Sequence, residues 1–324
     1  MACCPTVLPF SLEPIISYVS GVLIKCSSHP NSALNSTSQN TYGFNTSSAT
    51  SHTSSLLAVA SSFTQSFLST PKISLESERH VSNAYASINP RLSESDACSD
   101  EAIAVVTILA VYYLMHHQFA IGLVHFHRLR RMIELRGGLV KLIGANRCLA
   151  QKPWRLALEF ALQDDSRPIY DLQDVPIDFD ITPSSDTRML QSSPNSVSSY
   201  PCLSPKLLGL LLDIVQITHA LNDTSAVNKL EPMDYSDAVC VRLHSLLHFG
   251  PLGHRRPINP LDDLVYLSLV AIMTALMPGY GHNQAQYDLL SSQLQQALRR
   301  YVAISQRDLE MLLWRMFVAN ATVM

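Results

Sequence analysis

Histidine pairs are the residues of this sequence whose spacing could support metal chemistry. His244 and His248 lie four residues apart, so on a helix both rings would share a face and could hold zinc, with His254 close behind. The segment HSLLH lacks the glutamate of the zincin motif H-E-x-x-H, and no obvious carboxylate ligand stands beside it. His125 and His127 lie two residues apart and would point to different sides of a helix. The sequence therefore predicts no metal site, with one core-facing and one partly exposed histidine at 244 and 248.

Sequence motifs for covalent or phosphate chemistry are missing. The chain contains no G-x-S-x-G, no G-x-x-x-x-G-K-[ST] and no G-x-G-x-x-G. Asp164-Asp165 lies in an Asp- and Pro-rich stretch, and Asp262-Asp263 lies in the expected first turn of a helix, where acids are favoured anyway. A Gly-Tyr-Gly sequence at 279–281 follows an expected helix end and indicates a turn. We predict no catalytic, cofactor-binding or metal-binding residue, no cofactor, and a chain that is not an enzyme.

The segment His125–Arg155 is the most basic part of the chain. It carries eight Lys or Arg against the single acid Glu134, whereas residues 156–190 carry eight acids against two basic residues. A basic block can follow a nucleic-acid backbone. Here the neighbouring charges nearly cancel, no aromatic stacking series accompanies them, and the whole chain has a net charge of −3. We interpret the block as a solvated helix face complemented by the acidic segment, and we expect no specific DNA binding by this chain.

The spacing of apolar residues predicts the helices that would place these side chains. Ser99 is the expected N-cap of a helix that ends near Met115, and a second helix is expected over about 119–136. Gly137-Gly138 should end that second helix with a left-handed backbone. The buried face of the second helix is predicted from four residues: Phe126, Leu129, Met132 and Ile133. Further helices are expected at 151–163, 206–223 (after a Ser204 cap and Pro205), 237–249, 260–277, 285–302 and 307–320.

Residues 102–127 form the one candidate membrane span, because they carry no Asp, Glu, Lys or Arg and are long enough to cross a bilayer. His116, His117 and Gln118 fall in the middle of this segment, where polar groups are costly. Two buried helices joined near His117 fit better, so we expect no membrane association. Since no segment alternates apolar and polar residues convincingly, we predict an all-α fold, an irregular bundle of stacked antiparallel helices.

The amino-acid composition divides the chain into a Ser-rich N-terminal part and a helical domain. Residues 26–71 contain no charged side chain and are rich in Ser, Thr and Asn, so we expect them to be disordered. We predict that 1–96 is largely disordered or linker with short helical pieces, and that 97–324 is a helical domain with an internal loop at about 180–204. The seven cysteines are scattered, odd in number and never spaced C-x-x-C, which is typical of reduced intracellular thiols.

Several patterns occur in a fixed order along 97–320. An apolar helix, AIAVVTILAVYYL, precedes a helix led by His125 or His127 that ends in Arg136-Gly137-Gly138-Leu139. EFALQDDSRPIY follows. Later come Val265-Tyr266-Leu267, a leucine-rich helix with Leu289, Leu290, Leu294 and Leu298, then Leu312-Leu313-Trp314 and Phe317-Val318. This order resembles the regulatory domain of fungus-specific transcription factors, the helical region that usually follows a binuclear zinc-cluster DNA-binding domain.

The resemblance implies regulation of transcription through protein contacts or effector sensing. It implies partners among proteins or the transcription machinery, with a homodimer as one arrangement, and a nuclear location, with the cytoplasm as the alternative. The chain departs from the family because it lacks the six-cysteine array beginning C-x2-C-x6-C that holds two zinc ions, and because it ends soon after its Trp-containing segment; a truncated gene product or a divergent paralogue is expected. The alternatives are a helical interaction scaffold without a transcriptional role and an unrecognised helical enzyme.

Overall fold

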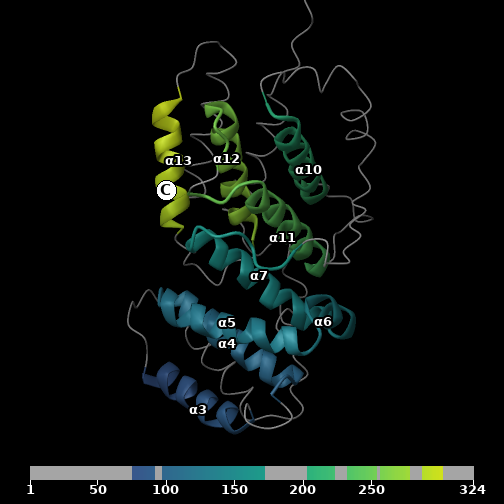
Figure 1. Cartoon of the computed structure of the whole chain (residues 1–324), viewed down its shortest axis with the longest axis vertical. Coiled ribbons are helices and arrows are strands. Elements are labelled where there is room, and N and C mark those ends of the chain that lie inside the picture. The colour runs from purple at the N-terminus through teal and green to yellow at the C-terminus, as the bar shows by residue number, and fades with distance from the viewer. Residues whose placement is uncertain are drawn as a thin grey trace, which may run out of the picture. The chain divides into compact units, whose positions relative to one another are not determined.

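A computed structural model of the protein describes residues 75–91, 97–171, 203–222, 232–253, 256–277 and 287–301. These residues form nine helices and no strand, which confirms the predicted all-α class (Figure 1). They fall into two compact units. One unit contains α3 (Leu75–Arg91), α4 (Asp100–Met115), α5 (Phe119–Leu135), α6 (Leu139–Ala145) and α7 (Arg147–Gln163). The other contains α10 (Pro205–Asn222), α11 (Pro232–Phe249), α12 (Pro260–Leu276) and α13 (Asp288–Arg300) from Leu289 onward.

Helices α4 and α5 form an antiparallel hairpin that lies at the centre of the first unit. They pack side by side along their lengths, and α7 packs against both (Figure 1). Gly122 permits this approach, because a Cβ atom there would lie 3.3 Å from the Phe160 ring of α7 and 3.4 Å from the Ala110 carbonyl of α4. The predicted buried face of α5 is confirmed, since Phe126, Leu129, Met132 and Ile133 are all buried.

The joint between α4 and α5 falls at His116–Gln118, where the sequence predicted a break. His117 has a φ of 55°, and the turn is closed by hydrogen bonds from Gln118 N to Tyr113 O (2.9 Å) and from His117 N to Leu114 O (3.1 Å). This pattern is a Schellman motif, which turns the chain out of a helix by placing one residue in a left-handed conformation. Among the described residues no helix has the length and apolarity that crossing a membrane requires.

The end of α5 repeats the same geometry with glycine. Gly137 and Gly138 have φ values of 103° and 93°, Gly138 N donates to Ile133 O (2.9 Å) and Gly137 N donates to Glu134 O (3.0 Å). The predicted left-handed C-cap is therefore confirmed. Helix α7 ends in a similar way at Asp165, whose φ is 50°. Asp164-Asp165, which the sequence placed in an Asp- and Pro-rich stretch, forms the turn that follows this helix.

Helix α7 begins at Arg147, four residues before the predicted start. Asn146 caps it, because its Oδ1 accepts from Leu149 N at 3.1 Å. The prediction was late because Pro153 is normally found in the first turn of a helix, whereas here it lies in the second. The seven residues of α6, which the sequence did not predict as a separate helix, connect the glycine turn to Asn146.

The second unit follows the predicted order of helices with shifted ends. Helix α11 begins five residues earlier than predicted and ends before Gly250, as expected, and α13 is shorter than 285–302 at both ends. Helix α10 begins at Pro205 as predicted, but the Ser204 hydroxyl is buried without a hydrogen-bond partner and does not cap it. Ser204 N instead donates to Asp262 Oδ1 of α12 (3.2 Å). Packing of α11 on α10 and α12 builds the core of this unit.

Some predictions lie outside the described residues. They are the disordered segment 26–71, nearly all of the loop at 180–204, the helix at 307–320, His254 and the Gly-Tyr-Gly turn. The domain limits 1–96 and 97–324 stay predictions, although the first range contains the 17 residues of α3.

Candidate protein-interaction surface

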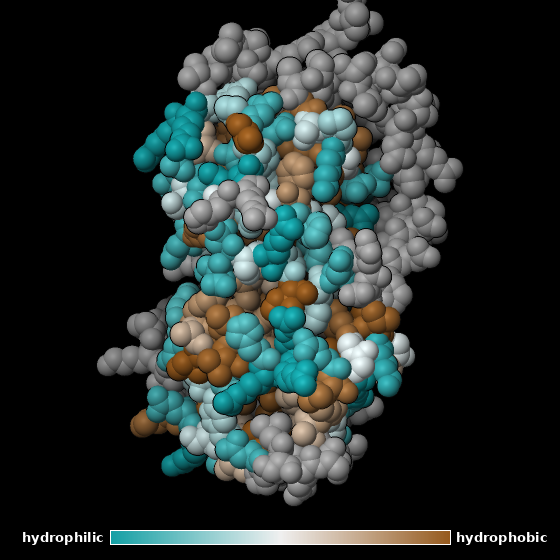
Figure 2. All heavy atoms as spheres, viewed as in Figure 1, coloured by the Kyte–Doolittle hydropathy of each residue, from teal (hydrophilic) through white to brown (hydrophobic). Residues whose placement is uncertain are grey.

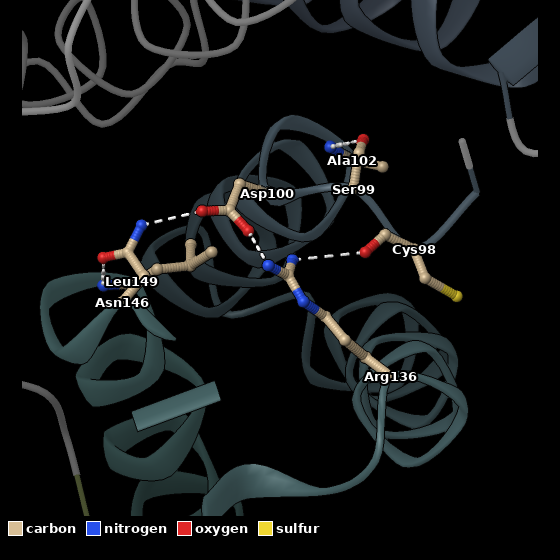
Figure 3. Close-up of polar contacts among 7 residues, drawn as sticks. All are labelled: Cys98, Ser99, Asp100, Ala102, Arg136, Asn146 and Leu149. Carbon is tan, nitrogen blue, oxygen red and sulfur yellow. Dashed lines mark hydrogen bonds and ion pairs between the residues drawn. The ribbon is translucent and has the colours of Figure 1, made fainter. Parts of the chain in front are cut away.

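A polar junction fixes the ends of three helices in the first unit (Figure 3). Arg136, the residue after α5, forms an ion pair with Asp100 at the start of α4, and it donates to the Cys98 carbonyl at 3.2 Å. Asn146 donates from Nδ2 to the other Asp100 oxygen at 2.9 Å while its own Oδ1 caps α7. Asp100 lies at a helix N-terminus and Arg136 at a helix C-terminus, so each charge also complements a helix dipole.

This junction holds structure together and presents no reactive group. Both oxygens of Asp100 are engaged, and the amide of Asn146 is used on both sides. The Cys98 sulfur points away from the ion pair (Figure 3). The junction therefore fixes the α4–α5 hairpin, so that the outer face of α5 is presented on a rigid element.

A second cluster of polar side chains connects α3 to the α4–α5 hairpin by hydrogen bonds. The Tyr85 hydroxyl lies 2.6 Å from His125 Nε2 and donates to the Tyr113 hydroxyl at 3.1 Å. The His125 ring stacks on Tyr113 with centroids 5.4 Å apart. Burial, and then the charge of Arg128, lowers the pKa of His125, and burial, and then the Tyr113 hydrogen bond, raises the pKa of Tyr85. Both groups are neutral near pH 7, so the cluster holds α3 in place as a neutral hydrogen-bonded unit.

The two histidines of each pair that the sequence considered differ in exposure. His125 is buried whereas His127 is exposed, and His244 is buried whereas His248 is exposed, with ring centroids 6.1 Å apart in the second pair. Within the described ranges, no three His, Cys, Asp or Glu side chains gather in a way that could hold a metal ion.

The Asp262-Asp263 pair is engaged at the start of α12. Asp262 accepts from Ser204 N, and Asp263 pairs with Arg256 at 3.6 Å. Burial raises the pKa of Asp263, while Arg256 and Arg300 lower it. These contacts give both carboxylates structural roles.

The basic block does not form one continuous patch. Arg155 is buried and pairs with Glu159 on its own helix at 2.9 Å, and Arg136 belongs to the polar junction. The predicted outward orientation of the arginines holds for the three on α5, which are exposed: Arg128, Arg130 and Arg131.

The outer face of α5 is the most distinctive exposed feature of the hairpin. Five residues at spacings of three and four follow one line along the helix, and we name them the α5 strip: Ile121, Val124, Arg128, Arg131 and Leu135. The three apolar members are 45%, 50% and 62% exposed in chain order. In the space-filling view, apolar side chains lie among hydrophilic ones over the region of α5 and α6 (Figure 2). Sequence reasoning missed this strip, although its spacing could be read from 119–136.

Comparisons with known proteins return nothing: no protein-family model, no curated protein and no solved structure matches this chain. The resemblance to fungal transcription-factor regulatory domains thus stays a prediction from the sequence.

Proposed function

We propose that this chain regulates transcription through contacts with other proteins, as a helical module that resembles the regulatory domain of fungal transcription factors. The α5 strip is the observation that carries the proposal. It is an exposed apolar and basic face on the same hairpin that carries the histidine-led and Arg-Gly-Gly parts of the resemblance. Exposed apolar side chains on a fixed helix are suited to binding a protein partner.

The polar side chains of the first unit described above form contacts between helices, and this supports a binding function more than a catalytic one. Asp100, Arg136 and Asn146 hold helix ends together, and Tyr85 and His125 hold α3 against the hairpin. A helical interaction scaffold without a transcriptional role would use the same face, so an experiment in cells must separate the two functions.

The test is a reporter assay in a fungal cell. The full chain is fused to an unrelated DNA-binding domain, and the transcription of a gene carrying its binding site is measured together with the location of the unfused chain. We expect nuclear residence and a change in transcription that is lost in the Ile121→Asp/Val124→Asp double variant. Leu75→Asp, at an 84% exposed position of α3, is the matched control and should behave as the wild type.

Two results would contradict the proposal. A nuclear chain that leaves the reporter unchanged has no regulatory activity. A cytoplasmic chain that leaves it unchanged favours the scaffold.

A further inference from the structure

We infer that the α5 strip binds an acidic amphipathic helix of a partner protein, an inference that rests on the proposed function and names the partner's chemistry. Along one line of the helix, the strip has two aliphatic side chains, then two arginines, then a third aliphatic side chain. A partner helix with apolar residues at the same spacing and carboxylates beside them would match both kinds of group.

The charges of α5 favour a partner with carboxylates. Its exposed face carries three arginines and a single acid, Glu134. Arg130 and Arg131 both bond to that carboxylate, at 2.8 and 3.3 Å, and these bonds lower the pKa of Glu134. Arg128 has no carboxylate partner among the described residues, so the face keeps a surplus of positive charge. A carboxylate beside Arg128 would complete a pairing that the described part of the chain does not provide.

The apolar residues of the α5 strip indicate how long the partner helix is and that the partner is a protein. Ile121 and Val124 are adjacent on the strip, and Leu135 closes its other end fourteen residues after Ile121. At 1.5 Å per residue the strip is roughly 21 Å long, which a partner helix of about four turns covers. Aliphatic side chains add nothing to contact with a phosphate backbone, and the strip has no aromatic ring on which a base could stack. A protein helix therefore fits this surface better than a nucleic acid does.

The Schellman turn and the polar junction keep the strip ordered before binding. Gly138 N closes the end of α5, and Arg136 ties that end to the start of α4. A fixed face loses little conformational freedom when a partner binds.

The experiment measures binding of the full chain to a fluorescent synthetic peptide by anisotropy. The probe is an eighteen-residue helix with leucines at i, i+3, i+7, i+10 and i+14 and glutamates beside them, and the control is the same composition in scrambled order. We expect a Kd on the order of 10–100 μM for the probe, as is typical of a small interface, and binding at least about tenfold weaker for the scrambled peptide.

Charge exchange provides the decisive comparison. Arg128→Glu/Arg131→Glu should weaken binding of the acidic probe at least about tenfold and should bind a lysine version of the probe better than the wild type does. Arg79→Glu, at an exposed position of α3, is the matched control and should change neither affinity. Circular dichroism confirms that each variant is folded.

Three outcomes would overturn the inference: equal binding of the scrambled peptide, an unchanged affinity in the double variant, or a duplex DNA that binds this face more tightly than the probe does. If the probe fails to bind while the reporter still responds, the partner chemistry is wrong and the proposed function stands. If the probe binds while the reporter is silent in the nucleus, the proposed function is wrong and the surface stands.

Discussion

Three helix ends in the first unit contain residues at positive φ: His117 after α4, Gly137 and Gly138 after α5, and Asp165 after α7. Glycine adopts this conformation without steric cost, whereas a residue with a Cβ atom pays roughly 1–2 kcal/mol. The left-handed turn at Gly137 could therefore be predicted from the sequence. A histidine and an aspartate in the same position could not, because either residue also occurs in many other conformations.

Valine at either glycine of the α5 turn should destabilise the first unit. Both Gly137 and Gly138 have positive φ, and a Cβ atom at Gly137 would also lie 2.8 Å from the flexible Lys141 side chain. We expect Gly137→Val and Gly138→Val each to lower the free energy of unfolding by about 1–2 kcal/mol through backbone strain. Gly144→Ala, in an open position within α6, is the control and should be neutral or stabilising. Thermal melts that match the wild type for both valine variants would contradict the role of the turn.

Replacing His117 with glycine should have the opposite effect. The left-handed backbone at His117 costs roughly 1–2 kcal/mol, and glycine removes that cost while losing about 0.5–1 kcal/mol through its freer unfolded chain. We expect His117→Gly to raise the free energy of unfolding by up to about 1 kcal/mol, measured by urea denaturation. His117→Val should lower it. If both variants were less stable than the wild type, the histidine ring would have a role beyond the turn.

The stability of the first unit should depend on His125 at mildly acidic pH. Burial and Arg128 lower its pKa below the ordinary value of about 6.5, so the folded state binds fewer protons than the unfolded state as pH falls through this range. The groups beside its ring are Tyr85 of α3 and Tyr113 of α4, and the charge that acts on it is that of Arg128 on α5. The free energy of unfolding is therefore unaffected by the protonation of His125 above about pH 6.5, the pKa of the unfolded state, and it falls as the pH decreases below that value.

We expect the melting temperature of the wild type to fall more between pH 7 and pH 5 than that of His125→Gln, which cannot titrate. Burial also lowers the pKa of His116, so the variant should keep a smaller pH dependence. Parallel curves for the two proteins would show that His125 does not contribute.

At the level of helices, the polar junction should contribute to the stability of α4, α5 and α7, whose ends it joins. Asn146 serves two helices because it caps α7 and bonds to Asp100 of α4. We expect Asn146→Ala to lower the free energy of unfolding by about 1–2 kcal/mol. Asn146→Ser should recover the cap but not the contact with Asp100, so the difference between Asn146→Ser and the wild type measures that contact, and the difference between the two variants measures the cap. Asn259→Ala, which removes the cap of α12 in the other unit, is the matched control. Equal stability of Asn146→Ala and the wild type would show that the contacts of Asn146 add nothing to stability.

The ends of the helices show what the sequence can predict. Ser99 and the polar residues after Met115 are strong local signals, and both ends of α4 were predicted correctly. The start of α7 was predicted too late, because proline usually occupies the first turn of a helix and Pro153 lies in the second turn of α7. The pair between Arg136 and Asp100 joins residues 36 positions apart, and no local pattern reports such a contact. The α5 strip was visible as spacing, but only the fold shows which apolar positions stay uncovered.

At the scale of the whole described structure, several charged side chains form local ion pairs, and these pairs include four arginines of the basic block. Arg155 is buried with Glu159, Arg136 is paired with Asp100, and Glu134 takes two of the arginines of α5. A continuous basic surface that follows phosphates would need these side chains free and on one face. Within the described part of the basic block, the exposed cations that share a helix are therefore the three arginines of α5.

This distribution predicts that the full chain does not recognise a DNA sequence. The cationic face of α5 can contact phosphates, but such contacts carry no sequence information. With few phosphates neutralised, weak binding should be nearly lost when salt rises from about 50 to 200 mM, and Arg128→Glu/Arg131→Glu should abolish it at low salt. Arg79→Glu is the matched control. The measurement is a titration of labelled duplexes at both salt concentrations. One duplex bound at least ~1,000-fold more tightly than random DNA at physiological salt would contradict the prediction, and would make α5 a helix that reads base edges.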